Sequence, residues 1–87
     1  MHRIFIENYI KQINKETIYK FALQNNISLT EKDVNILYHY LQNNWQDLLY
    51  GNQERAFMNL ENQIDDEKFL TIKNLFKYYF EKYQDLL

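Results

Sequence analysis

Few residues in this sequence are of the types that catalyse reactions or bind metal ions. The 87 residues include no cysteine and one glycine, so they supply no thiol nucleophile, no Cys-ligated metal site and no glycine-rich phosphate loop. His2 lies near the N-terminus, and His39 has no histidine or glutamate four residues later to complete a metal-binding pair on a helix. The run Asp65-Asp66-Glu67 directly precedes an apolar helical stretch, where acidic side chains cap helices. The sequence therefore predicts a protein that is not an enzyme and uses no metal or cofactor.

Charge and composition limit the kinds of partner that the chain is expected to bind. The formal net charge is −2 and the pI is about 5.6, which argues against general attraction to nucleic acid or to an anionic membrane. The stretch MHRIFIENYI lacks the pattern of a signal peptide, because Glu7 and Asn8 interrupt its apolar run. No stretch approaches the length of a membrane span. We therefore expect a cytoplasmic protein without a membrane partner.

The backbone that must position any functional residue is predicted to be helical. Proline is absent and glycine occurs once, which favours helices. Apolar residues recur at helical spacing and predict the segments 4–13, 15–25, 31 onward, 53–63 and 66–86. The last segment has the broadest apolar face, about 140° wide, so we expect it to be the longest and central helix. The sequence thus predicts an all-α fold, a small bundle of four or five short helices forming one domain over 1–87.

Polar residues mark the ends of these helices. N-terminal caps are predicted at Asn14, Thr30, Asn52 and Asp65. Thr30 precedes Asp33 by three residues, which resembles a capping box. A left-handed residue is expected at the asparagine pair 25–26, and Gly51 is expected to end the third helix in the same way. The pattern leaves open whether that helix continues through residues 43 and 44 as far as Gly51.

Trp45 is the single tryptophan and could be a core residue or a binding anchor. If the third helix is continuous, Trp45 lies within about 20° of Val34, which belongs to the inward-facing stripe. Large aromatic side chains are more often buried than exposed. We therefore predict that Trp45 packs in the core, with an anchor on the surface as the alternative.

Four apolar residues lie outside the inward-facing stripes. Ile36 and Tyr40 are one turn apart, roughly 120–160° from the inner face of the third helix. Leu70 and Tyr78 fall outside the main stripe of the last helix. In the interpretation that we favour, Ile36 and Tyr40 pack on another helix of the same chain. In the other, the four residues form a surface for a protein partner or for self-association.

These features favour a non-enzymatic protein–protein interaction module, with a homodimer as one form. The alternative is a nucleic-acid-associated regulator with a hairpin over 15–42 that resembles a helix-turn-helix. Ala22 could be the small residue of its first helix, and Asn26 could occupy the turn. However, Lys32 stands where an apolar residue should lock the second helix, and the exposed face offers Glu31 and Asn35 but no arginine. Nucleic acid is therefore not the expected partner.

Three runs also resemble a known group of proteins. These are ISLT at 27–30, which opens a helix, NQER at 52–55, and IKNLF at 72–76 in the final helix. Together they resemble an uncharacterised family of small all-helical proteins from Bacillus-type Gram-positive bacteria, and the resemblance covers most of the chain. It implies a bacterial protein with a helical fold and assigns no activity or functional residue.

Overall fold

A computed structural model describes the backbone of residues 2–84 and the side chains of residues 7–78, 81 and 82. The helices are α1 (His2–Gln12), α2 (Lys15–Gln24), α3 (Glu31–Leu49), α4 (Gln53–Glu61) and α5 (Asp66–Gln84). Within this part of the chain no strand occurs, so the all-α prediction is confirmed. The third helix continues through Asn43 and Asn44 to Leu49 as one element.

Helix starts follow the predicted capping pattern because side-chain oxygens satisfy free N–H groups of the first turn. In each case the cap accepts a hydrogen bond from the backbone N–H three residues later: Asn14 from Thr17, Thr30 from Asp33, Asn52 from Arg55, and Asp65 from Lys68. The Asp33 carboxylate also accepts from the backbone N–H of Thr30 at 3.0 Å, which completes the predicted capping box. These local bonds fix where α2, α3, α4 and α5 begin.

The end of α2 also agrees with the prediction. Asn26 has φ 59°, the left-handed conformation that asparagine tolerates. The Ile27 N–H then donates to the Ala22 carbonyl at 2.8 Å, and Ile27 becomes buried. This turn reverses the chain so that α3 can pack along α2.

The prediction that Gly51 ends α3 in a left-handed conformation is wrong. Gly51 has no positive φ, and the helix is capped by Tyr50, whose N–H donates to the Gln46 carbonyl at 2.8 Å. The glycine is needed for a different reason. A Cβ at position 51 would lie 3.0 Å from the Asp47 Cα and 2.5 Å from its carboxylate. The chain therefore turns tightly against the last turn of α3, where a side chain has no room.

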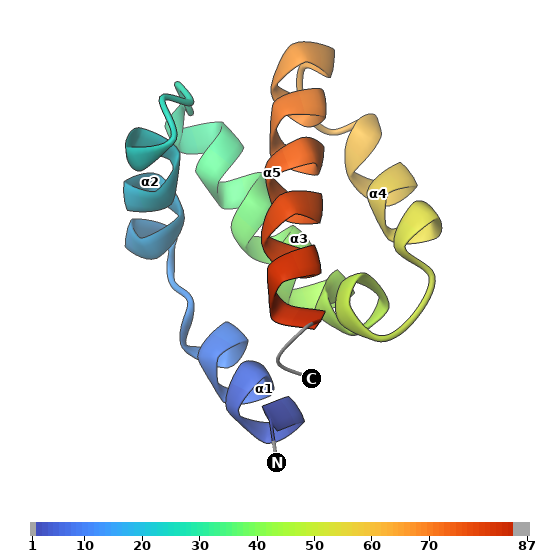
Figure 1. Ribbon diagram of the computed structural model, residues 1–87. Helices are drawn as coiled ribbons and strands as arrows, with labels where there is room; N and C mark the ends of the chain where they lie inside the picture. Colours follow the sequence, from blue (N-terminus) through green and yellow to red (C-terminus); the bar gives the residue numbers. More distant parts are fainter. Residues whose placement is uncertain (1, 85–87) are drawn as a thin grey trace.

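Successive helices from α2 to α5 alternate in direction (Figure 1). α3 packs against α1, α2 and α4, and α5 packs against α4. α3 and α5 each span 19 residues of the described chain. The prediction that the last helix is the longest and the central one is therefore not confirmed, because among the described residues α3 is as long and packs against more of the other helices.

The core lies where α3 meets its neighbours. Its buried side chains come from four helices: Ile18 of α2; Val34, Leu37, Tyr40 and Leu48 of α3; Ala56, Phe57 and Leu60 of α4; and Phe69 of α5. α3 supplies four of these nine residues because its apolar arc is covered from several sides. Among the described residues, no helix combines the length and the apolar character needed to cross a bilayer.

Candidate interaction surface

Tyr40 is a core residue, so the surface interpretation is wrong for it. Its side chain is 6% exposed, and its hydroxyl donates a hydrogen bond to the Ala56 carbonyl of α4. Burial raises the pKa of the Tyr40 phenol to about 12, since the phenolate would lose its hydration. Ile36 is partly buried and packs against the same core. Both residues therefore join α3 to the rest of the bundle, as the interpretation that we favoured from the sequence predicts.

Trp45 is buried at 9% exposure, as predicted. Its ring meets the Tyr50 ring edge-on, with centroids 6.5 Å apart. Trp45 lies inside the continuous helix α3, in phase with Val34 and Leu48. It does not present a large exposed aromatic surface, so it is not an anchor for a partner in this conformation.

Leu70 and Tyr78 are exposed on α5, at 56% and 54%. They lie eight residues apart, which places them about 12 Å apart along the helix axis and about 80° apart around it. The Lys82 ammonium lies 4.9 Å from the centre of the Tyr78 ring. The structure therefore leaves both residues accessible but does not combine them with Ile36 and Tyr40 into one patch.

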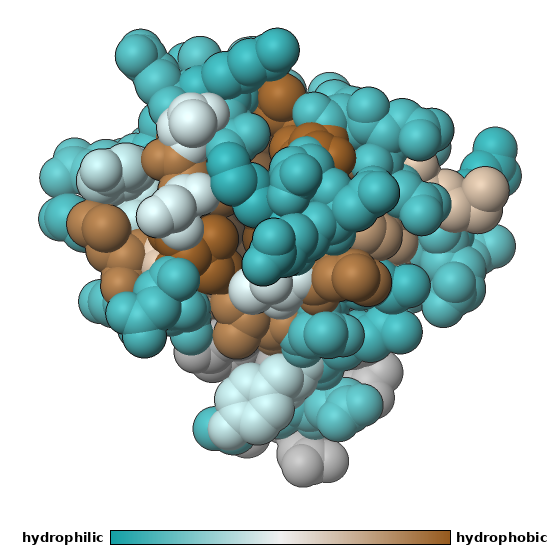
Figure 2. Space-filling view, turned by 90° about the horizontal axis from the view of Figure 1, so that it is seen from above, coloured by the Kyte–Doolittle hydropathy of each residue, from teal (hydrophilic) through white to brown (hydrophobic). Residues whose placement is uncertain are grey.

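Other exposed apolar residues were not found from the sequence. Tyr19, Phe21 and Leu23 of α2 are exposed, and so are Tyr9 of α1 and Met58 of α4. On α2, Tyr19 and Leu23 are one turn apart, so they share a ridge beside the buried Ile18. Seen from above, hydrophobic atoms are exposed on the side of the molecule where α2 lies and in the adjoining hollow (Figure 2). An apolar arc of about 200° on α2 is the signal that could have identified these residues.

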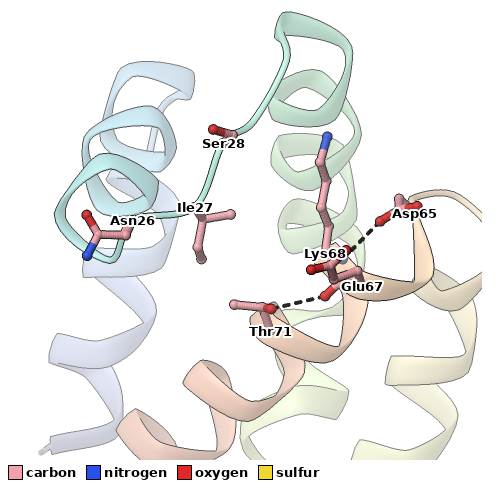
Figure 3. Close-up of a pocket in the computed structure, with 7 residues that line it drawn as sticks. All are labelled: Asn26, Ile27, Ser28, Asp65, Glu67, Lys68 and Thr71. Atoms are coloured by element: carbon pink, nitrogen blue, oxygen red, sulfur yellow. Dashed lines mark hydrogen bonds between the residues drawn. The ribbon is translucent and has the colours of Figure 1, made fainter.

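A shallow hollow separates the α2–α3 connection from the start of α5. It is lined by Asn26, Ile27, Ser28, Asp65, Glu67, Lys68 and Thr71 and encloses about 260 Å³ (Figure 3). Its main polar groups already have partners within the fold. The Lys68 ammonium contacts the Asp33 carboxylate at 2.7 Å, and the Thr71 hydroxyl donates to the Glu67 carbonyl at 3.0 Å. The first contact ties α5 to α3 and the second lies within α5, and we assign both a structural role.

Asp33 and Lys68 form a partly buried ion pair beside this hollow. Asp33 is 9% exposed, and its carboxylate accepts bonds from Lys68 and from the Thr30 N–H. The Lys68 ammonium, more than any other group, lowers the pKa of Asp33 below its ordinary value of 3.8, although burial acts in the opposite direction. The charged pair therefore holds α5 on the first turn of α3.

At the junction of α4 and α5, lysines of α5 lie over aromatic rings of both helices. Phe57 of α4 meets Phe76 of α5 edge-on, with ring centroids 5.8 Å apart. Above this contact, the Lys73 ammonium lies 5.5 Å from the Phe57 ring centre, and the Lys77 ammonium lies 6.0 Å from the same point. Lys73 is also 5.8 Å from the Phe69 ring centre. Two lysines therefore cover the aromatic junction of the two helices.

The remaining candidates for chemistry stay apart. His39 is exposed on α3, and its ring meets Tyr38 edge-on. The His2 side chain lies outside the described residues. In the part of the chain that the structure describes, no three histidine or acidic side chains converge as metal ligands would.

Comparison with protein-family models, with curated proteins and with solved structures finds no match.

Proposed function

We propose that this protein is a non-enzymatic interaction module of the cytoplasm that binds another protein chain, with self-association as one form of the same role. The observation that carries the proposal is the exposure of large apolar side chains on the outward sides of α2, α4 and α5. Single exposed apolar residues are normal on a soluble protein. Here Tyr19 and Leu23 share one ridge, and Met58 and Leu70 each directly follow a buried phenylalanine at the α4–α5 junction.

The alternative of a nucleic-acid-associated regulator stays a second prediction. Its hairpin over 15–42 corresponds to α2, a six-residue connection and most of α3. The outward side of α3 carries one exposed lysine, Lys32, together with Asp47, and its remaining exposed side chains include His39 and Asn43. This mixture supports a protein partner better, because nucleic-acid recognition depends on clustered arginine and lysine. The resemblance to an uncharacterised bacterial family likewise stays a prediction.

The experiment that tests the proposal measures partner binding with matched surface variants. Wild-type protein is examined by light scattering over a range of concentrations, and in parallel by quantitative affinity capture. One variant combines Tyr19→Ser with Leu23→Ser, and a second combines Met58→Ser with Leu70→Ser. Because all four side chains are exposed, each variant should keep the wild-type circular-dichroism spectrum. Asn43→Gln, on the exposed side of α3, is the control.

We expect wild-type protein to associate with itself or with a stoichiometric partner, and at least one apolar variant to lose that association. The control should behave as wild type. A monomeric wild-type protein without any stoichiometric partner would contradict the proposal. Equal association by wild type and both apolar variants would contradict it as well. Binding to duplex DNA or RNA that weakens steeply with salt would support the alternative.

A further inference from the structure

The α4–α5 face consists of two ridges with opposite charge. On α4, Glu54, Met58 and Glu61 are spaced by four and three residues, so they lie on one side of the helix, and all three are exposed. The Phe57 side chain points to α5, and Met58 follows about 100° further round the helix. The ridge of α4 is therefore an exposed methionine between two carboxylates.

The ridge of α5 has the complementary composition. Leu70, Lys73 and Lys77 are spaced by three and four residues and so also share one side of their helix. Leu70 is 56% exposed, and both lysines are half-buried over the Phe57 ring. A neutral ring attracts an ammonium group but does not neutralise its charge. The ridge of α5 is therefore an exposed leucine beside two cations.

Within the part of the chain that the structure describes, no ion pair involves the four charges of this face. Among the described residues, the ion pairs are Glu16–Lys20 on α2 and Asp33–Lys68 between α3 and α5. Neither involves the carboxylates of α4 or the two lysines over Phe57. Lys73 and Lys77 are one turn apart and repel each other, whereas Glu54 and Glu61 are two turns apart. A facing ridge of opposite charge would give the charges of both ridges a partner.

We infer that the α4–α5 face binds a second copy of this chain, with the acidic ridge of α4 in each copy facing the basic ridge of α5 in the other. This inference deepens the proposed function and rests on it. A twofold axis parallel to the two helices produces the arrangement, because it exchanges α4 and α5 between copies and keeps their heights. α4 and α5 run antiparallel (Figure 1), and Phe57 is level with Phe76. Glu61 of one copy then approaches Lys73 of the other, and Glu54 approaches Lys77.

The same face fits other partners less well. A nucleic acid would be attracted by the lysines and repelled by Glu54 and Glu61, which lie on the same face. A purely acidic protein segment would meet the same obstacle. A second copy satisfies both ridges at once and also brings Met58 and Leu70 out of water. Since the face is small, we expect a weak dimer with a dissociation constant roughly in the micromolar range.

Charge reversal with mixing tests this arrangement. The acidic-ridge variant carries Glu54→Lys and Glu61→Lys, and the basic-ridge variant carries Lys73→Glu and Lys77→Glu. The dissociation constant of each variant is measured by sedimentation equilibrium, alone and in an equimolar mixture. The control reverses the exposed ion pair of α2, Glu16→Lys with Lys20→Glu. Circular dichroism establishes that each protein is folded.

Each variant alone should dimerise about ten- to a hundredfold more weakly than wild type, because attractive contacts become repulsive. The mixture should recover dimerisation, since every facing pair of ridges again has opposite charge, and the control should match wild type. Recovery in the mixture separates contacts between copies from contacts within one chain. A wild-type protein that stays monomeric at about millimolar concentration would overturn the inference. So would variants that dimerise as wild type, or a mixture that does not recover. Partner capture through the Tyr19–Leu23 ridge would then still support the proposed function.

Discussion

Replacement of Lys68 by methionine removes the ammonium group that faces Asp33 and keeps most of the apolar stem. In the wild type the two charged atoms are 2.7 Å apart, with the Asp33 side chain 13% exposed and the Lys68 side chain 30% exposed. Removing one member of a fully buried ion pair costs about 3–5 kcal/mol. Since water reaches Lys68, and the Thr30 N–H still binds the carboxylate, we expect a smaller loss. A charged hydrogen bond of about 1.5–3 kcal/mol is the appropriate scale.

The pH dependence of the same variant gives an independent test. In the wild type the Asp33 pKa is lower in the folded state than its ordinary value of 3.8. The stabilising contribution of the carboxylate is therefore present above the unfolded-state pKa and is lost as the pH falls through the lower folded-state pKa. Lys68→Met should raise the folded-state pKa of Asp33, so that this pH-dependent contribution shrinks.

Urea unfolding at neutral pH measures the loss of stability, and an NMR titration of the Asp33 carboxyl measures its pKa. Lys20→Met is the matched control, because it breaks the exposed pair with Glu16. The control should cost at most about 0.5 kcal/mol. If Lys68→Met costs no more than Lys20→Met and the Asp33 pKa is unchanged, the claim that this pair holds α5 to α3 is refuted.

Three further substitutions test the packing around α3. Tyr40→Phe removes the hydrogen bond to the buried Ala56 carbonyl and should reduce the free energy of unfolding by about 0.5–1.5 kcal/mol; an unchanged urea midpoint would contradict this. Trp45→Ala should cost about 3–5 kcal/mol, because the ring is 9% exposed; near-normal stability in the same assay would show that the ring does not support the fold. Gly51→Ala places a Cβ 3.0 Å from the Asp47 Cα and should cost about 1–3 kcal/mol; a thermal midpoint equal to that of wild type would contradict the close approach.

Local sequence signals predict the helices well because their physical causes lie within a few residues. The Thr30–Asp33 box, the caps at Asn14 and Asn52 and the left-handed Asn26 depend on bonds to neighbours three to five residues away. The continuity of α3 through Asn43 and Asn44 was not decided by these signals. There, the burial of Tyr40 before the pair and of Trp45 after it outweighs the weak helix propensity of asparagine.

Features that depend on which helix covers which are harder to predict from the sequence. Tyr40 lies outside the predicted inner stripe, but α4 covers that side of α3 and supplies the Ala56 carbonyl as its partner. The width of the apolar stripe on α5 predicts a central helix, whereas α3 contacts more of the other helices. Lys68 pairs with Asp33, which lies 35 positions earlier in the sequence. No local pattern predicts that pairing.

The candidate surface was predicted only in part for the same reason. Leu70 is predicted from the sequence because it is an apolar residue outside the main apolar stripe of its own helix. Met58 is not among the residues predicted from the sequence, because the role that we propose for it depends on α4 lying antiparallel to α5. The opposite charges of the two ridges become visible once Phe57 and Phe76 fix the register between these helices.

Disulfide trapping between copies tests the arrangement of the proposed dimer most directly, since the chain has no native cysteine to interfere. Protein carrying Glu61→Cys is mixed with protein carrying Leu70→Cys under mild oxidation, and Asn43→Cys is the control. The twofold arrangement predicts that the disulfide between positions 61 and 70 of different copies forms faster than either same-position disulfide, and that position 43 forms little of either. Equal rates for all combinations, including those with position 43, would show random collision and would contradict the proposed interface.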